Sequence, residues 1–69
     1  MQASEIVNEI ITKIEGNYNI LAECIRVSVV KLTISDAEII HELKGMAEDN
    51  FPAIEKMLGT ELTNRIINF

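Results

Sequence analysis

The clearest pattern in the chain is an apolar stripe near its N-terminal end. Within residues 3–15 the apolar side chains recur at the spacing of one face of an α-helix. They are Ala3, Ile6, Val7, Ile10, Ile11 and Ile14. Ser4 belongs to the residue types that cap helix N-termini, and Gly16 suits the left-handed position that follows a helix C-terminus. The pattern predicts a helix over residues 4–15.

The most apolar run, residues 20–34, permits two interpretations. As a helix over residues 19–32, it keeps only a narrow polar stripe around Glu23 and Arg26, which is typical of a helix buried on most sides. As a strand over residues 25–34, it alternates apolar and polar side chains and makes use of its many β-branched residues. We favour the helix, because the chain offers no second strand-like segment to pair with the first.

The next segment carries three independent signs of a helix start. Ser35 and Glu38 have the spacing of a capping box, and Asp36 places a negative charge in the first turn. Ile34 precedes the cap in the position of a hydrophobic staple. Together these signs predict a helix over residues 36–48.

The C-terminal segment begins with a second boundary signal. Asn50 can cap a helix, and Pro52 suits a first helical turn, where its missing N–H costs nothing. The apolar residues that follow keep one helical phase to the end of the chain, which predicts a single bent or interrupted helix over residues 52–67. In the alternative, Gly59 ends one helix and Thr60 caps another.

The expected fold is all-α, in a single domain over residues 1–69. Short loops between helices favour antiparallel neighbours, so a small antiparallel four-helix bundle is the predicted architecture. Its helices are predicted at about 4–15, 19–32, 36–48 and 52–67.

Composition points to association. A chain of 69 residues buries only about 60% of the surface that its unfolded form exposes. Yet 48% of the residues are apolar, so apolar surface is left over, and such surface marks an interface. We therefore predict a non-enzymatic protein–protein interaction or oligomerisation module of the adaptor, assembly or inhibitor type, with a homo-oligomer as its expected state. The predicted interface residues, from the last helix and its flanks, are Phe51, Leu58, Leu62, Ile66, Ile67 and Phe69.

Charge argues against nucleic acid as the partner. The formal net charge is −5, and the six basic residues are scattered along the chain. The alternative function follows from element order, because a strand at 25–34 followed by two helices resembles the ribbon-helix-helix family of dimeric DNA-binding regulators. That resemblance implies that Arg26 and Ser28 would face the DNA. The net charge and the additional N-terminal helix do not fit the family.

No catalytic, cofactor or metal site is predicted. Glu38 and His41 have a spacing that di-iron carboxylate bundles use, but such sites need further ligands that this chain does not supply. Cys24 is the only cysteine, so the chain can form neither an intramolecular disulfide nor a thiolate cluster. A free cysteine of this kind is ordinarily buried and packs as a small apolar side chain. We therefore expect that the protein is not an enzyme.

The location expected from the sequence is the cytoplasm. The N-terminus lacks the basic region of a signal peptide, and charges interrupt every apolar run short of a membrane span. A single cysteine fits a reducing compartment.

Overall fold

In a computed structural model of the protein, helices form most of the described residues, which are 2–31 and 35–69. They are α1 (Ala3–Ile14), α2 (Ile20–Lys31), α3 (Asp36–Asp49), α4 (Phe51–Leu58) and α5 (Thr60–Ile67). The described residues contain no β-strand, which confirms the all-α prediction.

The apolar run that permits either a helix or a strand is helical from Ile20 to Lys31. Because α2 continues to Lys31, the strand over residues 25–34, and with it the ribbon-helix-helix arrangement, is wrong for this part of the chain. Residues 32–34 lie outside the described residues. The end of the predicted helix 19–32 and the Ile34 staple therefore lie there too.

Local sequence sets most of the helix ends. Ser35 caps α3 as predicted, because its hydroxyl oxygen accepts a hydrogen bond from the backbone N–H of Glu38 at 3.3 Å. Gly16, just after α1, has the predicted positive φ of 79°. The cap expected at Ser4 is wrong, since α1 begins one residue earlier and Gln2 occupies its N-cap without a side-chain hydrogen bond.

The predicted helix over residues 52–67 is two helices. Gly59 has a φ of 90° and a ψ of 154°, a backbone conformation that interrupts the helical hydrogen-bond ladder between α4 and α5. Thr60 is the first residue of α5 rather than its cap. The buried hydroxyl of Thr63 donates to the carbonyl oxygen of Gly59 at 2.8 Å, which satisfies an acceptor at the break. The described residues therefore form five helices instead of the predicted four.

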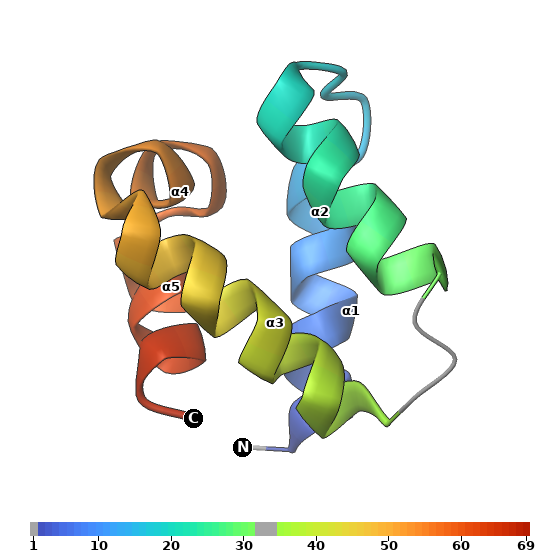
Figure 1. Ribbon diagram of the computed structural model, residues 1–69, viewed down its shortest axis with the longest axis vertical. Helices are drawn as coiled ribbons and strands as arrows, with labels where there is room; N and C mark the ends of the chain where they lie inside the picture. The colour runs from blue at the N-terminus through green and yellow to red at the C-terminus, as the bar shows by residue number, and fades with distance from the viewer. Residues whose placement is uncertain (1, 32–34) are drawn as a thin grey trace.

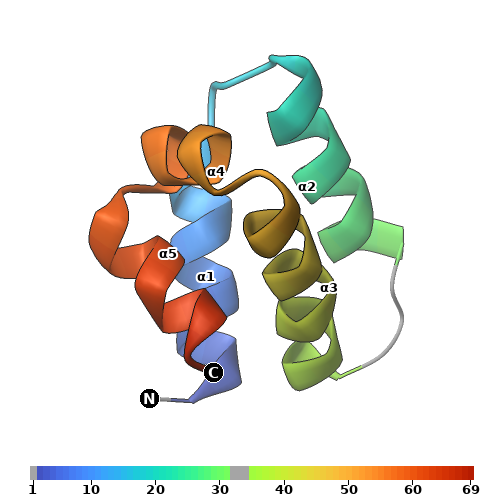
Figure 2. The ribbon, with the colours of Figure 1, turned by 60° about the vertical axis from the view of Figure 1, so that its left-hand side comes forward.

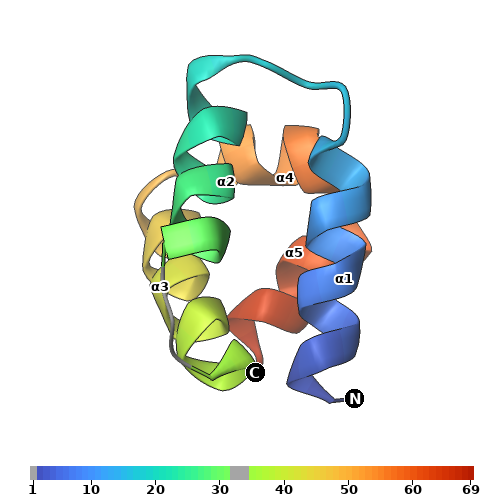
Figure 3. The ribbon, with the colours of Figure 1, turned by 90° about the vertical axis from the view of Figure 1, so that its right-hand side faces the viewer.

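The helices surround one core, with α2 at its edge. α1 and α2 form a hairpin (Figure 1), and α4 runs across the view in Figure 3, where α1 runs vertically. α1 and α3 each pack against all of the other helices, whereas α2 packs mainly against these two. The two ends of the chain lie at the same end of the molecule (Figure 2). Within the described residues, one side of α2 is consequently left exposed.

The core is almost entirely aliphatic. Among the described residues, eight of the fourteen buried apolar side chains are isoleucines, and every helix contributes at least two. They are Ile6, Val7, Ile10, Ile14, Ala22, Ile25, Ile39, Ile40, Leu43, Ala47, Ile54, Leu58, Leu62 and Ile66. The radius of gyration of 10.6 Å is close to the value of about 11 Å for a folded chain of this length.

Candidate protein interface

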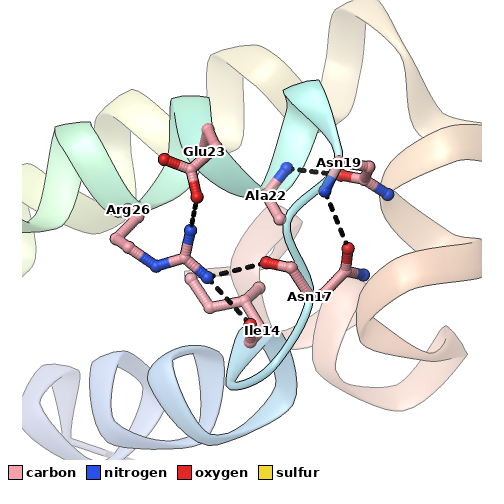
Figure 4. A network of polar contacts seen from close by, with 6 residues as sticks. All are labelled: Ile14, Asn17, Asn19, Ala22, Glu23 and Arg26. Carbon is pink, nitrogen blue, oxygen red and sulfur yellow. Dashed lines mark hydrogen bonds and ion pairs between the residues drawn. The ribbon is translucent and has the colours of Figure 1, made fainter.

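The loop between α1 and α2 is built from two asparagine turns. The side-chain oxygen of Asn17 accepts a hydrogen bond from the backbone N–H of Asn19 at 3.1 Å. The side-chain oxygen of Asn19 in turn accepts from the N–H of Ala22 at 2.8 Å (Figure 4), a contact that caps the N-terminus of α2. These contacts fix where α2 begins.

Arg26 fastens α2 to the end of α1. Its Nη2 donates to the carbonyl oxygens of Ile14, at 3.0 Å, and of Asn17, at 2.8 Å (Figure 4). Its Nη1 forms an ion pair with Glu23, one turn back on α2, and its guanidinium carbon lies 5.4 Å from the ring centroid of Tyr18. Ile14 ends α1, and its carbonyl also accepts from the backbone N–H of Asn17 at 3.0 Å, so Arg26 is a second donor to that helix end.

These contacts make Arg26 a structural residue. The ribbon-helix-helix resemblance would need this side chain to face DNA. Here the guanidinium is instead directed to two backbone carbonyls and a carboxylate within the same chain.

α2 is apolar on both of its sides. Its inner side is anchored by Ala22 and Ile25, which are fully buried. On its outer side, Ile20 is 85% exposed, Val27 is 46% exposed and Cys24 is exposed as well. These three residues follow each other at i, i+4 and i+7, so they form one stripe along the helix.

The stripe continues sideways into a groove between α2 and α1. Val30, 73% exposed, and Val29 line it from α2, Ile11, 43% exposed, lines it from α1, and Tyr18, 78% exposed, lines it from the loop. The groove has a volume of about 350 Å³. We refer to the outer stripe and this groove together as the α2 face; its exposed apolar residues are Ile11, Tyr18, Ile20, Cys24, Val27 and Val30.

The interface residues predicted from the sequence occupy two different environments. Leu58, Leu62 and Ile66 are buried in the core, where they hold α4 and α5 against the other helices. Phe51 and Ile67 are half-buried. Phe69 is exposed, and its ring meets the edge of His41 at a centroid distance of 6.4 Å. The structure does not bring these six side chains together in one exposed patch.

The interface predicted from the sequence is drawn from the last helix and its flanks alone, although the sequence also carries a signal for α2, its narrow polar stripe. A helix whose charged residues before its last position are only Glu23 and Arg26 has more apolar circumference than a small domain can cover.

The residues considered for chemistry are dispersed. Cys24 lies on the α2 face rather than in the core, and His41 is exposed on α3 beside Phe69. Across residues 2–31 and 35–69, no group of three His, Cys, Asp or Glu side chains is arranged to hold a metal ion. None of the helices described is long and apolar enough to cross a membrane.

A second, polar cavity lies between α1 and the start of α5. Its volume is about 600 Å³, and it is lined by Lys13 and Arg65 together with Glu9 and Glu61. Arg65 forms an ion pair with Glu9 across it. Because both charge signs are equally represented, the cavity gives no electrostatic preference for an anion or a cation.

Comparisons of the chain with models of known protein families, with curated proteins and with solved structures found no match.

Proposed function

We propose that the protein is a non-enzymatic interaction module that associates with a second copy of itself through the α2 face. The observation that supports this proposal is the exposed apolar stripe on a helix that is otherwise part of the fold. Exposed apolar side chains that stand singly are common on protein surfaces, but six that adjoin on one helix and its groove are typical of an interaction site.

The area of the α2 face suits a weak, reversible contact. A whole aliphatic side chain presents about 100 Å², and a tyrosine about 200 Å². With the exposed fractions of Ile11, Tyr18, Ile20, Val27 and Val30, the face offers on the order of 400 Å² of apolar area per copy. Complete coverage of both faces would bury about 800 Å² of it as an upper limit, which falls in the range of transient complexes, below about 1,200 Å².

The distribution of charge supports a pairing of like molecules at this face. Residues 20–31 carry one acidic and two basic residues, a net charge of +1. The whole chain carries −5, so the remaining residues carry −6. Contact through α2 would join two copies at their least acidic part and keep the acidic surfaces apart.

Substitution of Val27 by glutamate tests the proposal. Wild-type protein is expected to be dimeric near about 1 mM and monomeric near about 1 μM, the range in which weak complexes dissociate, measured by light scattering over a dilution series. The V27E protein is expected to stay monomeric throughout, because a charge would be buried at the contact.

Asn64→Glu is the matched control, because Asn64 is exposed on α5 and the substitution adds the same charge away from the α2 face. It should weaken the dimer far less than V27E does, because its added charge acts only through long-range repulsion. Circular dichroism verifies that both variants fold. A wild-type protein that is monomeric at every concentration would refute self-association, and equal association of V27E and wild type would place the interface elsewhere.

The proposed setting is the cytoplasm, where the single exposed thiol of Cys24 would stay reduced. We propose no cofactor and no enzymatic activity.

A further inference from the structure

The geometry points to one arrangement of the pair: two copies of α2 lie antiparallel against each other, with the two-fold axis midway between residues 25 and 26. This inference rests on the proposed self-association and adds the partner segment and its direction. It follows from the shape of the stripe, the position of its smallest residues and the order of charges along α2.

The stripe runs along the helix axis. Ile20, Cys24 and Val27 are spaced as the contact positions of paired helices are, with steps of four and three residues. A stripe of this form fits another helix laid lengthwise, because a helix presents the same spacing in return. The twelve residues of α2 give a contact of about 18 Å in length.

A two-fold axis makes the stripe complementary to itself. In a symmetric pair, residue i contacts residue j of the partner and j contacts i. With the axis between residues 25 and 26, Cys24 faces the position of Val27 in the other copy, and the position of Ile20 faces that of Lys31. The two residues at the centre, Cys24 and Val27, have small side chains, so the helix axes can approach to about 8–10 Å.

Charge order along α2 favours the antiparallel direction over the parallel one. Glu23 and Arg26 form an ion pair within each chain, which leaves the position of Lys31, at the C-terminal end of α2, as the charged one on the stripe. Antiparallel pairing sets the two Lys31 positions at opposite ends of the contact and opposes the two helix dipoles. Parallel pairing would set the two Lys31 positions side by side.

Disulfide trapping distinguishes the two directions. Two proteins are prepared, Ile20→Cys and Lys31→Cys, each with Cys24→Ser so that one thiol remains per chain. Each is exposed to oxidised glutathione alone and as an equal mixture. In the antiparallel pair, positions 20 of the two copies are eleven residues apart along the axis, about 16 Å. A disulfide requires Cα atoms within about 7 Å.

The expected result is that the mixture forms a cross-linked dimer and that neither protein forms one when it is oxidised alone. Light scattering first establishes that each variant still associates. Cross-linking of the Ile20→Cys protein with itself would overturn the antiparallel direction while leaving self-association intact.

Two further outcomes are separable from that one. A dimer that forms in solution but cross-links in none of these samples would overturn the α2 contact and leave self-association through another surface. A protein that is monomeric in every sample would overturn the proposed function itself, and with it this inference.

Discussion

Arg26 adds a polar connection between the middle of α2 and the end of α1, two helices that also pack against each other in the core. Its two hydrogen bonds to the carbonyls of Ile14 and Asn17 fix the angle between α1 and α2, and thus the groove of the α2 face. The ion pair with Glu23 is half-exposed, so it adds little stability in water. The carbonyl contacts are therefore the important ones.

From this we predict the effect of removing the guanidinium. Arg26→Gln should lower the free energy of unfolding by about 1 kcal/mol, since two charge-assisted hydrogen bonds are lost at a partly exposed site. Arg26→Lys should lose most of the same amount, because an ammonium group lacks the planar fork that reaches both carbonyls. Urea denaturation measures both values.

Lys56→Gln serves as the control for the lost charge, because Lys56 is exposed on α4. It should unfold at a urea concentration close to that of the wild type, because the exposed Lys56 loses only a weak interaction with the dipole of α4. If Arg26→Gln were as stable as this control, the contacts at the end of α1 would contribute no net stability.

Gly45 and Gly59 differ in backbone conformation, and this difference explains why the helix is interrupted at Gly59 but not at Gly45. Gly45 lies within α3, and a Cβ atom added there would meet nothing within 4 Å. Gly59 has equal space around it but a φ of 90°, which side chains rarely tolerate. The two glycines therefore differ in their backbone angles, and neither is crowded by neighbouring atoms.

Alanine at these two positions should have effects of opposite sign. Gly45→Ala should raise the free energy of unfolding by about 0.5–1 kcal/mol, through helix propensity and a less flexible unfolded chain. Gly59→Ala should lower it by about 1–3 kcal/mol, because alanine must adopt a strained conformation. Thermal unfolding measures both, with about 4–8 °C expected per kcal/mol in a domain of this size.

Whether Gly59→Ala lowers or raises the free energy of unfolding tests whether the C-terminal segment is two helices or one. In one continuous helix over residues 52–67, alanine would replace glycine at a helical position and would stabilise the protein. A raised melting temperature for Gly59→Ala would thus contradict the break between α4 and α5.

How far the sequence predicts each element depends on whether the deciding interaction is local. Ser35 and Gly16 act within a few residues of themselves, and both were predicted correctly. The break at Gly59 was left open, because the apolar residues on either side of it keep the same helical phase. Periodicity records which side of a helix is apolar, and it carries no information about a single backbone angle.

The candidate interface was harder to predict for a related reason. An apolar stripe looks the same in the sequence whether it packs in the core or faces solvent. Leu58, Leu62 and Ile66 form such a stripe and are buried, whereas Ile20 and Val27 form another and are exposed. Which stripe is covered depends on how five helices fit together, and α2 is exposed because it lies at the edge of that arrangement.

For the molecule as a whole, the charge of −5 opposes association even where the α2 face favours it. Two copies repel each other at long range, while the apolar contact acts only at short range. The two effects respond differently to salt. Screening shortens the range of the repulsion, from a Debye length of about 30 Å at 0.01 M ionic strength to about 8 Å at 0.15 M.

We therefore predict that added salt strengthens the dimer. The dissociation constant, measured by sedimentation equilibrium, should fall between about 0.01 M and 0.15 M ionic strength, because screening weakens the repulsion and leaves the apolar contact in place. Glu61→Gln removes one negative charge from α5, away from the α2 face, and should reduce this salt dependence without altering the contact. An interface held mainly by ion pairs would behave in the opposite way, with a dissociation constant that rises as salt is added. That result would leave the apolar face without the role proposed for it, even if the protein is a dimer.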